Sequence, residues 1–152
     1  MYGLKRNNPE AGTATAELSV ILPLLLLGIV GLTDFGRAAM ESITIANAAH
    51  AGAMYGSHSP GHMGDAMGIQ SAVQAELQDM GDISSVVIES ERYCNCPDGS
   101  VVDCEDGVCG LDDKLRRTYI RVRVEKLFST VVNYPGVPEV ITLAREAHVR
   151  AR

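Results

Sequence analysis

The sequence lacks tryptophan and is poor in bulky aromatic and basic residues. Among 152 residues there are two Phe, five Tyr and no Trp. Any folded core must therefore be small and mostly aliphatic. Lys and Arg number 13 against 19 Asp and Glu, which gives a formal net charge of −6. Because binding of nucleic acid needs clustered cationic side chains to neutralise phosphates, this balance argues against nucleic acid as a partner.

Motifs of catalytic chemistry are also missing. The chain has no Gly-rich phosphate loop ahead of a helix, no H-E-x-x-H pattern, and no nucleophile with a base placed beside it by spacing. We therefore expect neither an enzyme nor a cofactor-binding protein. The length suits one small domain with an appendage.

Residues 18–33 carry no charged side chain. We interpret this segment as the appendage to the small domain. Residues 13–33 include "VILPLLLLGIVGL". A helix of a soluble protein would have a polar face, and this run has none. A helix of that length spans about 32 Å, which matches one hydrocarbon core. Lys5 and Arg6 precede it, so the positive-inside tendency predicts a cytoplasmic N-terminus and an outer C-terminal part.

The helical pattern continues past the apolar run. A secretory signal peptide would have a shorter apolar region and a clear cleavage site, for which "RAAMES" is a poor match. We expect one helix over residues 13–57, with its membrane half at 13–33, its outer half at 34–57 and a kink at Pro23. Small or apolar residues recur at helical spacing in the outer half and predict a packing face, namely Ala39, Ile43, Ala46, Ala49 or His50, and Ala53.

A single carboxylate, Glu17, stands near the start of this apolar run. It lies four residues after Thr13, which is about 6 Å along a helix. If the chain were cut between Gly12 and Thr13, the new α-amine of the same or a neighbouring chain could approach it. The opposite charge of that amine would then offset the cost of placing the carboxylate in an apolar setting.

The N-terminal residues resemble a known family. Gly12, Glu17 and the apolar run resemble the class III signal of type IV prepilins. More narrowly, "GTATAELSVILPLLLLGIVGLTDFGRA" followed by "ITIANAAHAGAMYG" resembles the TadE-like family, the minor pilins or pseudopilins of tight-adherence (Flp, type IVb) pili. The resemblance covers about residues 11–57. The family often carries basic residues within the last run, where His50 and Met54 stand here.

The resemblance implies a structural role in a filament. A prepilin peptidase would remove the leader, residues 1–12, between Gly12 and Thr13, and Glu17 would align the subunit with its neighbour. The partners would be other pilin or pseudopilin subunits, the pilus assembly machinery and the lipid bilayer. The subunit would lie in the bacterial inner membrane with its C-terminal domain in the periplasm, or in an extracellular filament for adhesion or secretion. The alternative is an uncleaved, membrane-tethered binding module.

A small domain follows at residues 58–152. His58 and His62 are four apart, but Pro60 and Gly61 disfavour the helix that a metal site there would need. Asp65 is expected to cap a second helix over 65–80, which Gly81 ends.

Alternating patterns predict strands at 85–93 and 118–128. Residues 139–151 suit a helix or a strand, and we choose the strand because it completes a sheet. The predicted fold class is α+β and pilin-like. It has a long N-terminal helix, a short second helix and a three-stranded antiparallel sheet with a disulfide-stapled loop.

Four cysteines, Cys94, Cys96, Cys104 and Cys109, cluster in "CNCPDGSVVDCEDGVC". Outside the cytoplasm we expect two disulfides, with the connectivity open and a Cys94–Cys96 bond disfavoured by its short ring. A zinc site is the rival, although the spacing is not a usual one, and a redox-active dithiol is a further alternative. A calcium site is also open, with the candidate ligands Asp98, Asp103, Glu105 and Asp106.

Overall fold

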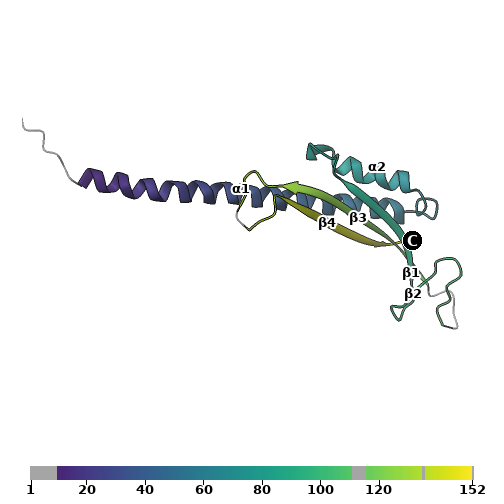
Figure 1. Ribbon diagram of the computed structural model, residues 1–152. Helices are drawn as coiled ribbons and strands as arrows, with labels where there is room; N and C mark the ends of the chain where they lie inside the picture. Colours follow the sequence, from purple (N-terminus) through teal and green to yellow (C-terminus); the bar gives the residue numbers. More distant parts are fainter. Residues whose placement is uncertain (1–9, 111–115, 135, 152) are drawn as a thin grey trace, which may run out of the picture. The chain divides into compact units, whose positions relative to one another are not determined.

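A computed structural model describes residues 10–110, 116–134 and 136–151, with side chains from residue 14 onward. The chain divides into two compact units, Met1–Arg37 and Ala38–Arg152. The predicted α+β class is confirmed (Figure 1). The elements in chain order are α1 Glu10–Ser57, α2 Ala66–Glu76, the 3₁₀ turn η1 Gln78–Met80, and strands β1 Val87–Asn95, β2 Val101–Val102, β3 Arg117–Ser129 and β4 Val140–Arg150.

The first unit contains the apolar part of α1. The helix is continuous through Pro23. Its described aliphatic side chains are exposed, apart from Val30, which is partly buried. The hydroxyls of Ser19 and Thr33 donate to the backbone carbonyls of Ala16 and Ile29, so these polar groups are satisfied within the helix. By length and composition α1 could cross a membrane.

The second unit is organised around close approach to the outer half of α1. A Cβ built on Gly52 would lie 2.6 Å from Val73 of α2, and one on Gly56 would lie 3.1 Å from Ile120 of β3. The missing side chains let α2 and β3 pack directly on the α1 backbone. The core consists of Ile45, Ala48, Ala49, Ala53, Ile69, Val73, Leu77, Ile120, Val122 and Val124.

The buried face of α1 is rotated from the predicted one. Ala49 and Ala53 are buried as expected, but Ile43 is exposed and Ile45 is buried in its place. Small residues occur on several sides of the outer half, so their spacing alone did not identify the packed side.

The sheet has four antiparallel strands in the order β2-β1-β3-β4. The prediction of three strands was wrong because β2 has only two residues, in which no alternation can be seen. The ambiguous segment 139–151 does form a strand, β4, at one edge of the sheet. In β3 the alternation is as expected, since Ile120, Val122 and Val124 are all buried.

The second helix is shorter than predicted but starts at the expected cap. The Asp65 carboxylate accepts a hydrogen bond of 2.9 Å from the Gly68 backbone N–H and one of 2.8 Å from the Tyr55 hydroxyl. These bonds fix the start of α2 against the end of α1 and hold the pKa of Asp65 below its ordinary value, the backbone bond contributing most. α2 ends at Glu76, and η1 continues to the positive-φ residue Gly81.

Candidate functional site

The N-terminal segment carries the first group of predicted site residues. Gly12 and Thr13 lie in the first turns of α1, which begins at Glu10. The leader residues before Glu10 lie outside the described residues, as do the side chains at the predicted cleavage point. Glu17 is exposed on α1, within the stretch of exposed aliphatic side chains. A carboxylate in that position is open to a partner that approaches the helix from outside.

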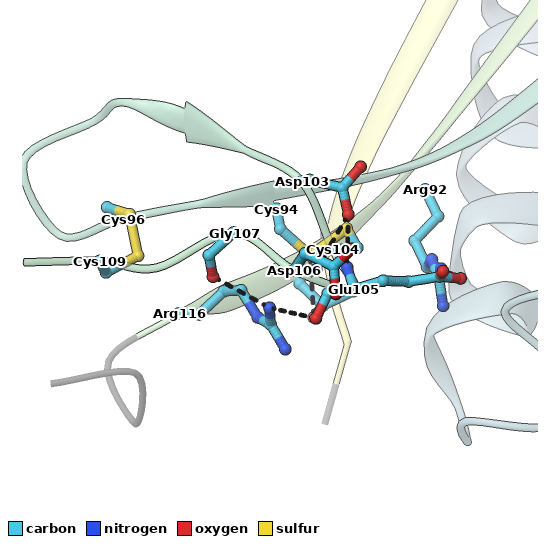
Figure 2. Close-up of a disulfide and its surroundings, with 11 residues drawn as sticks. Arg92, Cys94, Cys96, Asp103, Cys104, Glu105, Asp106, Gly107, Cys109 and Arg116 are labelled. Carbon is cyan, nitrogen blue, oxygen red and sulfur yellow. Dashed lines mark hydrogen bonds and ion pairs between the residues drawn. A yellow bond between two sulfur atoms is a disulfide. The ribbon is translucent and has the colours of Figure 1, made fainter.

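The four cysteines form the second group, and all of them are paired. Cys94 bonds to Cys104 and Cys96 to Cys109, with Cα–Cα distances of 5.2 and 5.4 Å (Figure 2). The register explains the first bond, because Cys94 of β1 lies opposite Val102 of β2 and so brings position 104 back beside it. Two disulfides were predicted, and the structure now gives their pairing. Neither a thiolate zinc site nor a free dithiol is compatible with this state.

Two carboxylates of the disulfide loop, those of Asp98 and Asp103, stabilise its turns by accepting hydrogen bonds. Asp98 Oδ1 accepts from the backbone N–H and the hydroxyl of Ser100. Asp103 Oδ1 accepts from the N–H groups of Glu105 and Asp106 at 2.7 and 3.2 Å. These bonds, those from backbone N–H groups first, hold the pKa of both aspartates below the ordinary value.

The calcium hypothesis finds no support in this arrangement. Within the described part of the chain, no group of three or more His, Cys, Asp or Glu side chains is arranged to hold a metal ion. Asp98 and Asp103 instead accept hydrogen bonds from groups of the loop itself.

Two arginines tie the loop to the sheet. The Arg116 guanidinium donates to the carbonyl oxygens of Glu105 and Gly107 at 3.5 and 3.1 Å (Figure 2). Arg92 of β1 forms an exposed ion pair with Glu105. Sequence reasoning missed both contacts, because nothing in the local pattern says which basic residue will face the loop.

A buried ion pair was missed as well. Lys126 Nζ of β3 lies 2.9 Å from Glu41 Oε2 of α1, and the two side chains are only 8% and 21% exposed. The residues are separated by 85 positions, so the pairing depends on how β3 lies along the outer half of α1.

The two histidines of the turn after α1 are near each other but do not form a ligand pair on a helix. α1 ends at Ser57, and the ring centroids of His58 and His62 are 6.0 Å apart. The Nδ1 atom of His62 is 2.8 Å from the Ser59 hydroxyl. This contact orders the turn, in agreement with the expectation that Pro60 and Gly61 would prevent a helix there.

These features define a class of protein. It is a small α+β domain with a doubly disulfide-bonded loop, which incorporates the outer half of a long N-terminal helix apolar enough to cross a membrane. The family model described as TadE-like protein matches residues 12–54, so the resemblance predicted for the N-terminal segment is confirmed. The match associates the chain with the Tad pilus system. Comparisons with curated proteins and with solved structures found no match.

Proposed function

We propose that this protein is a structural subunit of the tight-adherence pilus system, of the minor pilin or pseudopilin kind. In this proposal residues 13–33 anchor it in the bacterial inner membrane, and the second unit lies in the periplasm. A prepilin peptidase removes residues 1–12, and the mature subunit is assembled into or beneath a filament for adhesion or secretion. Its role is in assembly, without catalysis.

One observation carries the proposal. The segment that matches the TadE-like family, residues 12–54, begins at the predicted cleavage point and includes both Glu17 and the exposed aliphatic run. Such a helix needs an apolar surrounding, and Glu17, the one acidic residue of the sequence 13–33, needs a positive partner there. A processed N-terminal α-amine supplies that charge at the required end of the helix.

The first test is the N-terminus of the native protein. N-terminal sequencing of protein from native membranes and from sheared filaments should start at Thr13. The intact mass should show the loss of residues 1–12 in a host that has the peptidase. Protein that still begins at Met1 in both fractions would instead indicate the uncleaved tethered module.

The second test is the Glu17→Ala variant. We expect normal membrane insertion and processing but fewer subunits in sheared filaments, because the terminal amine loses its counter-charge. Ser19→Ala is the matched control, since the Ser19 hydroxyl donates to the carbonyl of Ala16 in its own helix and the residue lies two positions after Glu17. Equal filament incorporation of both variants would contradict the role assigned to Glu17.

A further inference from the structure

The connection between β3 and β4 has one charged residue, its last, on a domain that is otherwise rich in charge. We call the described residues 130–134 and 136–139 of this connection, "TVVNY" and "GVPE", the valine loop; among them only the last, Glu139, is charged. Its base is closed by a bond from the Thr130 N–H to the Glu139 carbonyl, and a turn bond joins the Val137 N–H to the Tyr134 carbonyl. Exposed aliphatic side chains cover the loop and the adjoining strand ends, namely Leu127, Val131, Val132, Val137, Val140 and Ile141.

The course of β3 fixes which end of the domain carries this loop. Gly56 of α1 packs at Ile120, Gly52 at Val122, and Glu41 pairs with Lys126. Residues further along β3 therefore contact residues that come earlier in α1. The 11 steps from Gly52 to Glu41 span about 17 Å of helix, and the four steps from Val122 to Lys126 span about 13 Å of strand. β3 and the outer half of α1 thus run antiparallel, and the valine loop lies at the end where Ala38 enters the domain.

That end is also the one nearest the proposed membrane segment along the chain. Five residue steps separate the end of the apolar run at Thr33 from Ala38, which is about 8 Å as helix and at most about 18 Å when extended. The polar headgroup layer on one side of a bilayer is about 5–8 Å thick. The loop end of the domain is therefore within reach of the lipid interface.

We propose that the valine loop is a second membrane contact, which inserts its aliphatic side chains into the headgroup–acyl boundary of the leaflet at which α1 emerges. The inference rests on the membrane anchoring in the proposed function. Contiguous exposed apolar side chains on a soluble surface mark an interaction site. The absence of charge over residues 130–138 suits lipid, and Tyr134 is of the type that concentrates at membrane interfaces. Two contacts would fix the orientation of the domain, which one helix alone would leave free to rotate.

The absence of tryptophan makes a direct test available. The full-length Val132→Trp variant, reconstituted into phosphatidylcholine–phosphatidylglycerol vesicles, would be compared with and without brominated acyl chains. We expect blue-shifted emission and about a twofold loss of intensity with brominated lipid, because the probe would lie within about 10 Å of the boundary. Val137→Trp, on the other arm of the loop, repeats the measurement in case the first substitution disturbs the fold.

Two controls separate the outcomes. Val101→Trp in β2, at the opposite end of the sheet, should show unshifted and unquenched emission, while Leu27→Trp in the apolar run should be strongly quenched. If Leu27→Trp is quenched but the loop variants behave like Val101→Trp, the loop proposal is wrong and the anchor stands. If Leu27→Trp is not quenched, the proposed membrane anchoring is wrong, and the loop proposal, which rests on it, is wrong as well. Blue-shifted but unquenched loop emission that depends on protein concentration would assign the loop to contact with a second copy, which also overturns the proposal.

Discussion

The ion pair between Lys126 and Glu41 should be a major determinant of how the sheet sits on α1 within the second unit. Its atoms are 2.9 Å apart and both side chains are largely buried. Lys126→Met keeps most of the volume of the side chain but removes its charge. The Glu41 carboxylate is then left without its partner in a site where water solvates it poorly.

The expected cost follows from that burial. Removing one partner of a fully buried pair typically destabilises a protein by about 3–5 kcal/mol. Because the Glu41 side chain is 21% exposed, some solvation is retained, and we expect a loss of about 2–3 kcal/mol in the free energy of unfolding. Adding Glu41→Gln should recover part of this loss, because the unpaired charge is then removed as well.

The assay is urea unfolding of the full chain in detergent micelles, followed by tyrosine fluorescence and far-UV circular dichroism. Arg92→Met is the matched control, since it removes the exposed pair with Glu105, and it should cost less than about 1 kcal/mol. Equal losses for Lys126→Met and Arg92→Met would refute the reasoning. So would a double variant that unfolds as readily as Lys126→Met alone, because the unpaired charge would then not be the cause.

Two further predictions concern the loop and the cap of α2. Replacing Cys96 and Cys109 together by Ser opens a ring closed over a sequence separation of 13. The free energy of unfolding, measured with urea, should fall by about 3 kcal/mol. An unchanged unfolding midpoint would show that the Cys94–Cys104 bond alone holds the loop. Asp65 has its pKa lowered in the folded state, so its stabilising effect is present above its ordinary pKa and is lost as the pH falls through the lowered value. The difference in melting temperature between the native protein and Asp65→Asn should therefore shrink from pH 6 to pH 3, whereas a constant difference would contradict this.

Long periodic patterns made much of this fold predictable. α1, α2, β1 and β3 are present where the apolar spacing indicated them, with ends displaced by a few residues. The choice of strand for residues 139–151 was also right. The local pattern of this segment suited a helix and a strand equally, and we chose the strand because it completes the sheet.

The features that were not predicted depend on contacts between residues far apart in the sequence. β2 consists of Val101 and Val102 only, and it pairs with β1 where the disulfide from Cys94 to Cys104 draws the loop back. The pairing of the cysteines and the Lys126–Glu41 contact likewise depend on register, which composition does not encode. At the N-terminus the match to the TadE-like family supports the segment as a whole, and the roles of Gly12, Thr13 and Glu17 stay predictions.

The order of the disulfides along the chain has a consequence for resistance to proteases. The bonds interleave, since Cys96 lies inside the ring closed by Cys94 and Cys104, while Cys109 lies outside it. A single cut anywhere between positions 96 and 109 therefore leaves the two fragments covalently joined. Between 96 and 104 two bonds join them, and between 104 and 109 one bond does. A nicked molecule would migrate as one species until reductant was added, and it would keep β1 and β3 tethered to each other.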